Sequence, residues 1–247
     1  MGQSGKGRIE LFEDFTGPDC PVANAEASTT PGHFIGPFKI TGDTVETDTG
    51  TVNVDKANGY LRISGNNEDG KGVAIGTNPI FSPVLNGTLV LEARLEMQAL
   101  TTRVAFAGFC TVNAADVAEP CTSTGTTITA VAAGYAGFLL DSQFTASTQW
   151  HMPYYGGATT GVTTGATVAC GSGVVAVAAE SDVLRIEIDN NGTARWFING
   201  ILRQTVAGAV STTTLLAGLV GCWGTTSTAA DADVDYLLVR ANRDWTR

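Results

Sequence analysis

The most informative stretch of the chain runs from Ser181 to Val206 and reads SDVLRIEIDNNGTARWFINGILRQTV. Every second residue is apolar along Leu184–Asp189 and again, with Ala194, Trp196 and Ile198, along the next run, and this period of two is typical of strands with one buried face. Asn and Gly tolerate positive φ angles, so Asn190-Asn191-Gly192 and Asn199-Gly200 predict tight turns. The stretch therefore predicts an antiparallel hairpin whose apolar face belongs to the core of a β-sandwich.

The rest of the chain repeats this pattern in shorter form. Helical periodicity is almost absent, and about a dozen alternating or apolar runs are bounded by Gly, Asn and Asp turn residues. In the run LVLEARLEM at 89–97, Glu92, Arg94 and Glu96 share one side, which we interpret as a solvated face with pairing within the strand. The number of short runs predicts an all-β sandwich or barrel of antiparallel strands.

We expect residues 1–247 to form a single domain, because all-β sandwiches often reach this length. Residues 1–8 are expected to be an N-terminal arm, and residues 241–247 a C-terminal tail. The segment 156–181 consists almost wholly of small residues, and we expect a long loop there.

Composition and charge narrow the classes of partner. The chain is 43% hydrophobic and only 15% charged, and its formal net charge of −10 argues against binding to nucleic acid or to an anionic membrane. No secretory signal and no membrane-spanning run is visible, so we expect assembly in the cytoplasm of the cell that makes the protein. Between Arg103 and Glu180 there are only three charged residues. This charge-poor segment indicates either burial against neighbouring subunits or loops in a charge-poor protein.

Cysteine and histidine offer little chemistry. The five cysteines are too scattered for a disulfide scaffold, although Cys110 and Cys121 could bridge a loop. Of the two histidines, His33 lies in an expected loop and His151 in an expected strand, where a structural role is favoured. Asp141, Asp231 and Asp233 follow no recognised calcium spacing. We therefore expect no metal and no cofactor.

A fragment of a catalytic motif occurs at Glu187-Ile188-Asp189. It resembles the start of the E-x-D-x-x-E signature of concanavalin-like glycoside hydrolases that cleave laminarin and related glucans. Retaining hydrolysis needs two carboxylates about 5–5.5 Å apart, and Gly192 stands where the motif has its acid–base glutamate. The sequence therefore predicts no catalytic residues and a protein that is not an enzyme.

Aromatic residues are the remaining candidates for a binding site. Trp196 is expected in the core, at the centre of a strand. We expect Trp150, Tyr154 and Tyr155 to be exposed, and we name them together with Trp223 as candidate contacts to a partner protein or a glycan.

Several short motifs together resemble a known superfamily. They are Phe12-Glu13-Asp14-Phe15, Gly59-Tyr60-Leu61-Arg62-Ile63, Leu91-Glu92-Ala93-Arg94, the W-F-I-N-G ending at 196–200 and the closing strand 234–239. Their order is similar to that in the concanavalin A-like (laminin G-like) jelly-roll superfamily. The pieces 105–109 and 136–141 further resemble a group of tailed-phage virion proteins.

The resemblance implies a jelly-roll β-sandwich and a structural role. Its main implication is a non-enzymatic phage virion protein, a decoration or cement protein that binds the major capsid protein on the capsid exterior, and we expect a homotrimer. The alternative is a carbohydrate-binding, lectin-like module or phage adhesin with the same fold. A third hypothesis, a glycoside hydrolase, depends on the carboxylate that Gly192 replaces.

Overall fold

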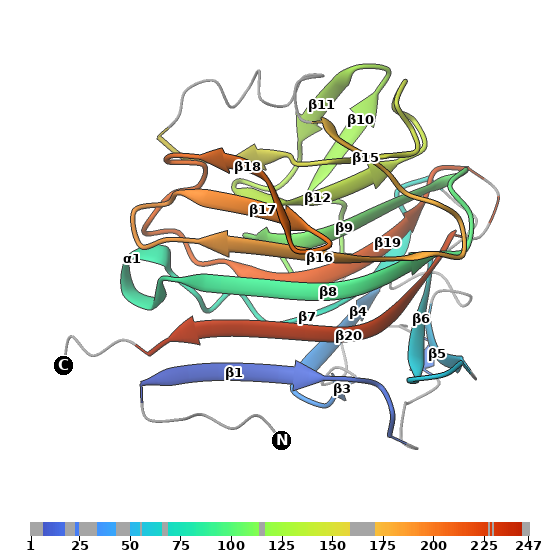
Figure 1. The fold of residues 1–247 in the computed structure, drawn as a ribbon, viewed down its shortest axis with the longest axis horizontal. Coiled ribbons are helices and arrows are strands. Elements are labelled where there is room, and N and C mark those ends of the chain that lie inside the picture. The colour runs from blue at the N-terminus through green and yellow to red at the C-terminus, as the bar shows by residue number, and fades with distance from the viewer. Residues whose placement is uncertain are drawn as a thin grey trace.

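The computed structural model describes residues 7–17, 23–24, 34–42, 50–54, 56–65, 69–113, 117–158, 171–226, 228 and 230–243. Over these residues the chain forms two antiparallel sheets that pack face to face (Figure 1). The all-β antiparallel sandwich that the sequence predicts is confirmed.

The front sheet, nearer the viewer in Figure 1, carries the hairpin predicted for residues 181–206. Its strands, in spatial order, are β18 (Ile201–Val206), β17 (Ala194–Ile198), β16 (Ser181–Ile188), β8 (Leu89–Met97), β20 (Ala230–Asn242), β6 (Tyr60–Gly65), β5 (Gly50–Val54) and β2 (Ala23–Asn24). Strand β20 pairs with β6 through its first half and with β1 (Arg8–Glu13) through its second half.

The back sheet is built around β9 and β19. Its spatial order is β15 (Gly171–Val175), β13 (Gln149–His151), β12 (Tyr135–Asp141), β9 (Arg103–Cys110), β19 (Ala217–Gly224), β7 (Gly72–Gly76), β4 (Phe38–Gly42) and β3 (Phe34–Ile35), with β14 (Tyr154–Tyr155) on β12. A separate hairpin joins β10 (Cys121–Thr124) to β11 (Thr127–Ala130), and a single helical turn, α1, spans Pro83–Asn86.

The β16–β17 hairpin places its apolar face between the sheets. Leu184, Ile186 and Trp196 are fully buried, and Trp196 Nε1 donates a hydrogen bond to the carbonyl oxygen of Gly137 on the back sheet. Burial of side chains of this size stabilises a fold by about 1.5–3 kcal/mol each. The turns form at the predicted residues, since Gly192 and Gly200 both have φ of 77°.

The β10–β11 hairpin covers the outer face of the back sheet. Cys121 and Ile128 from this hairpin share a second buried cluster with Phe106, Tyr135 and Trp223. The back sheet is therefore buried on both faces. The outer face of the front sheet, in contrast, carries half-buried and exposed side chains along β8, β16, β17 and β1.

Two boundaries differ from the sequence-based prediction. Strand β15 lies inside the segment 156–181, where we expected only a loop, because Gly171–Val175 pairs along β13. Strand β20 continues into the expected C-terminal tail as far as Asn242, which pairs with Arg8. None of the helices in the described part is long and apolar enough to cross a membrane.

Candidate functional site

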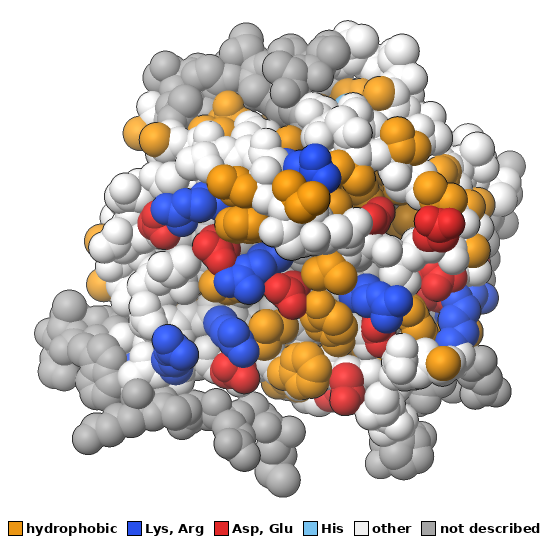
Figure 2. Space-filling model, viewed as in Figure 1, with side chains coloured by type: hydrophobic (Ala, Val, Ile, Leu, Met, Phe, Trp, Pro, Cys, Tyr) orange, Lys and Arg blue, Asp and Glu red, His pale blue; other side chains and the backbone are white. Residues whose placement is uncertain are grey.

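Two rows of side chains cross the outer face of the front sheet at right angles to its strands. The Phe197–Phe12 row consists, strand by strand, of Phe197, Arg185, Glu92, Leu238 and Phe12, and the Arg195–Glu10 row of Arg195, Glu187, Val90, Arg240 and Glu10. Members of a row are directly opposite one another in the strand register, so their side chains are neighbours on one face. Figure 2 shows this face with basic, acidic and apolar side chains interspersed.

Arg185 is the centre of this surface. Its Nη1 lies 3.4 Å from Glu92 Oε2, and its Nε and Nη2 donate to Glu187 Oε1. Glu92 also accepts a hydrogen bond of 2.9 Å from Tyr236 Oη. These residues border a cavity of about 290 Å³, here called the Phe197 cavity, whose walls include Glu92, Arg185, Glu187 and Phe197.

Charged residues further along the same face pair between strands. Arg94 Nη1 lies 2.5 Å from Asp235 Oδ2, and Lys56 Nζ lies 2.6 Å from Glu96 Oε1. The expectation of a solvated face with pairing within the strand 89–97 is met only in part: Glu92 and Arg94 are half-buried, Glu96 is buried, and their ion pairs are made with other strands and with Lys56. Side chains directly opposite on neighbouring antiparallel strands are close enough to pair, whereas on β16 Arg185 and Glu187 do pair within one strand.

The chemistry of the face is set by these contacts. Burial and the hydrogen bond to Glu92 raise the pKa of Tyr236, so its phenol remains a proton donor to that carboxylate at neutral pH. The hydrogen bond from Arg195 lowers the pKa of Asp189, which therefore stays ionised. The surface offers fixed donors, fixed acceptors and two aromatic rings, an arrangement suited to polar ligands with apolar faces.

The Glu-x-Asp fragment, Glu187 and Asp189, lies on this face, and no glutamate occupies the third position of the motif, which is Gly192. A side chain at Gly192 would collide with the carbonyl oxygen of Val210, so the turn has no room for a glutamate. Glu92, from the neighbouring strand β8, instead contacts the same guanidinium as Glu187. Sequence spacing alone missed this second carboxylate because it lies 95 positions earlier in the chain, as the numbering shows.

Two carboxyl groups with raised pKa values lie on the other side of the molecule. Burial raises the pKa of Glu119 to about 8, and burial also raises that of Asp141, which accepts a hydrogen bond from Ser123. Raised carboxyl pKa values often mark functional sites. Here Glu119 and Asp141 are both buried, so they present no accessible acid to a polymer.

The four aromatic residues that we named as candidate contacts belong to the back sheet. Trp150 and Trp223 are 0% exposed; their indole groups donate to Asp182 Oδ2 and to the carbonyl oxygen of Val117, each at 2.8 Å. The expected exposure of Trp150 is therefore wrong, and neither indole reaches the surface. Tyr154 and Tyr155 are half-buried and lie against Trp196 and Tyr135.

The cysteines and His151 are structural in this fold. Cys110, Cys121 and Cys222 are buried thiols, so the bridge between the first two is not formed, and burial raises the pKa of Cys110 and Cys222 to about 12. His151 is buried against the ring of Phe144. Among the described residues no group of three His, Cys, Asp or Glu side chains could hold a metal ion. Cys20, His33 and Cys170 lie outside the described residues.

Comparison with known proteins identifies the fold. No protein-family model and no curated protein sequence matches the chain. A protein of unknown function from Shewanella oneidensis MR-1 superposes with a TM-score of 0.64 at 11% identity, covering 100% of this chain and 92% of that one. The fold is a concanavalin A-like jelly roll.

Two further proteins of similar fold are named as enzymes that cleave polysaccharides. An alginate lyase in complex with alginate trisaccharide has a TM-score of 0.57 at 12% identity, over 95% of this chain and 98% of that one. The endo-β-1,3-glucanase from Pyrococcus furiosus has a TM-score of 0.55 at 15% identity, over 94% of each chain. At this identity the likeness shows the fold alone.

These comparisons correct one prediction and leave others untested. The prediction that the chain is not an enzyme does not stand, because the structures of similar fold are mostly glycoside hydrolases and lyases. The absence of a complete catalytic motif in the sequence is therefore a poor reason to conclude that a protein is not an enzyme. The comparisons give no support to the expected phage origin and capsid role. The homotrimer, the major capsid protein as partner and the location on the virion remain predictions.

Proposed function

We propose that the protein binds a polysaccharide across the outer face of the front sheet. The observation that carries the proposal is the Phe197–Phe12 row, which places an aromatic ring at each end and the Arg185–Glu92 pair between them. Five strands separated by about 4.8 Å give the row a length of roughly 19 Å. That length accommodates an oligosaccharide rather than one sugar.

The chemistry of the row matches that of sugars. Aromatic rings pack against the apolar faces of sugar rings, and charged hydrogen-bonding groups fix their hydroxyls. Phe12 is 45% exposed and lies 6.2 Å from the ring of Tyr236, so part of its surface is free for a ligand. The carbohydrate-cleaving proteins of similar fold add general support, as proteins that act on alginate and on β-1,3-glucan.

Cleavage of the bound polysaccharide is the second candidate. Glu92 and Glu187 contact the same guanidinium, so two carboxylates are close together on the proposed binding face. A hydrolase needs one of its two carboxyl groups protonated as the general acid. Both groups instead accept hydrogen bonds from Arg185, so the arrangement favours binding over hydrolysis.

The test measures binding to a panel of neutral and anionic polysaccharides by affinity electrophoresis. The double variant Phe12→Ala/Phe197→Ala should bind at least about tenfold more weakly, a loss of roughly 1.4 kcal/mol. Phe34→Ala is the matched control, because Phe34 is 58% exposed on the back sheet. Failure of the native protein to bind any polymer, or an equal loss in the control, would overturn the proposal.

The same polymers are assayed for new reducing ends and for unsaturated products. Cleavage by the native protein that is lost in Glu92→Gln and in Glu187→Gln would establish the second candidate. Binding without any cleavage would reject it.

A further inference from the structure

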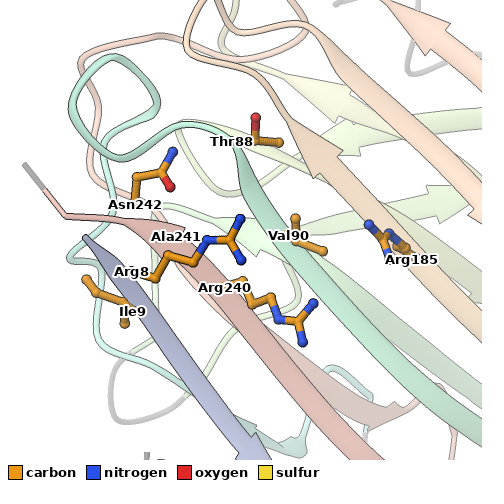
Figure 3. Close-up of a pocket in the computed structure, with 8 residues that line it drawn as sticks. All are labelled: Arg8, Ile9, Thr88, Val90, Arg185, Arg240, Ala241 and Asn242. Atoms are coloured by element: carbon orange, nitrogen blue, oxygen red, sulfur yellow. The ribbon is translucent and has the colours of Figure 1, made fainter. Parts of the chain in front are cut away.

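A second cavity adjoins the Phe197 cavity on the same face and shares Arg185 with it. It has a volume of about 270 Å³ and is bordered by Arg8 of β1, Arg185 of β16 and Arg240 of β20. Figure 3 shows these three arginines around Val90 and Ala241, with Thr88 and Asn242 at the far edge. We call it the arginine cavity. No acidic side chain is among the residues that line it.

The arginines keep hydrogen-bond donors available. Within the described part of the chain Arg8 has no ion pair, and it is exposed. Arg240 uses Nε to contact Glu10 Oε2 at 2.8 Å, in a pair whose side chains are 45% and 41% exposed. An ion pair as exposed as this one is weak and is readily exchanged for a ligand. Arg185 is the more fully paired of the three, through Glu92 and Glu187.

The concentration of positive charge is unusual for this chain. Lysine and arginine number only 14 against 24 acidic residues, yet three of the 14 border one cavity without a carboxylate. The net charge of −10 repels polyanions at long range, but salt screens charges beyond about 8 Å at physiological ionic strength. Contacts inside the cavity therefore decide whether an anion binds there.

We propose that the arginine cavity binds the carboxylate or sulfate group of an anionic polysaccharide whose chain lies along the Phe197–Phe12 row; this inference rests on the proposed function. Guanidinium groups bind both anions with paired hydrogen bonds. The side chain of Val90, directly opposite Arg240 in the register, provides an apolar floor for the sugar ring that carries the anion. The volume of about 270 Å³ is slightly below the usual range for ligand pockets, so the cavity suits one substituted sugar.

The test uses two pairs of polymers that differ only in charge. Polygalacturonate is compared with its fully methyl-esterified form, and dextran sulfate with dextran. The native protein should prefer the charged member of at least one pair by about tenfold or more, and which pair responds distinguishes carboxylate from sulfate. The preference should weaken as salt is raised from 50 to 300 mM, because the contacts are ionic.

The variants locate the preference in the cavity. Arg8→Ala/Arg240→Ala should lose most of the tenfold preference and keep its binding to the neutral polymers. The control Lys39→Ala/Arg203→Ala also removes two positive charges, but from β4 and β18, outside the cavity. It should keep the preference for the charged polymer. Circular dichroism and thermal unfolding verify that both variants are folded.

The two proposals fail in different ways. Equal binding of charged and uncharged polymers by the native protein would overturn the arginine cavity as an anion site and leave polysaccharide binding intact. A loss of preference as large in the control would also overturn it. Failure to bind any polymer would overturn the proposed function and this inference together.

Discussion

Tyr236 Oη donates a hydrogen bond of 2.9 Å to Glu92 Oε1 on the outer face of the front sheet, and so joins β20 to β8 through side chains as well as through the backbone. The same carboxylate contacts Arg185 on β16. Glu92 thus links three adjacent strands at the centre of the proposed binding face.

Replacement of Tyr236 by Phe removes this link and leaves the ring. We expect the free energy of unfolding to fall by about 1 kcal/mol, because Glu92 keeps its contact with Arg185 and stays in reach of water. Urea unfolding at pH 7 measures the change. Because burial raises the pKa of Tyr236, its stabilising effect is complete below the ordinary tyrosine pKa of about 10 and is lost above it. The variant should therefore lose less stability than the native protein between pH 9 and 11.

Glu119 should make stability decrease with pH in the neutral range. Its pKa is raised to about 8 by burial, and the unfolded chain releases that proton near pH 4.3. The contribution is therefore fully present below about pH 4.3 and is lost as pH rises to about 8. Glu119→Gln should be at least about 1 kcal/mol more stable than the native protein at pH 8, with little difference at pH 4.5. Urea unfolding at both pH values measures this difference in the free energy of unfolding. An equal difference at pH 4.5 and pH 8 would contradict a Glu119 carboxyl that is buried in its neutral form.

Gly192 and Gly200 provide a matched pair of substitutions in the central hairpin. Both have φ of 77°, where an L side chain costs about 1–2 kcal/mol. A Cβ at Gly192 would also meet the Val210 carbonyl oxygen, whereas Gly200 faces open space. Gly192→Ala should therefore lower the free energy of unfolding by clearly more than Gly200→Ala does. Equal losses would show that the turn at Gly192 can shift away from Val210.

Trp150 separates stability from binding. Trp150→Phe removes the indole donor to Asp182 and should cost about 1–3 kcal/mol of unfolding free energy. Asp182 keeps a hydrogen bond of 2.8 Å from Asn199 Nδ2, which favours the lower part of that range. Because the ring is fully buried on the back sheet, binding to polysaccharides should not change. Weaker binding by the folded variant would indicate that the binding site includes Trp150 of β13.

The alternation of apolar and polar residues was sufficient to predict the hairpin but not to locate the candidate site. Alternation tells which residues share a face, so Leu184 and Trp196 could be assigned to one side and Arg185 and Glu187 to the other. Alternation does not tell whether a second layer covers that face. The β10–β11 hairpin covers the outer face of the back sheet, and Trp223 became a core residue for that reason.

Register is the second quantity that the sequence does not contain. Phe12, Glu92 and the hairpin that carries Arg185 and Phe197 are far apart in the chain, and only the pairing of β1, β20, β8 and β16 places them in one row. Each residue alone has an ordinary explanation as part of a solvated strand. Arg8 and Arg240 were overlooked for the same reason, since they lie at opposite ends of the sequence and meet through one strand pair.

The pairing of Arg8 with Asn242 has a practical consequence for any assay of this protein. Arg8, the first residue of β1, and Asn242, the last residue of β20, both line the arginine cavity. A purification tag, a fusion partner or a sensor surface joined directly to either of these strand ends would therefore sit next to the proposed ligand. A polyhistidine tag could compete as a cation, and a carboxylated chip could itself act as the anion. Attachment through a cysteine introduced at the exposed Thr129 of β11, with both ends of the chain left unmodified, keeps the linker away from the cavity, because β11 covers the outer face of the opposite sheet.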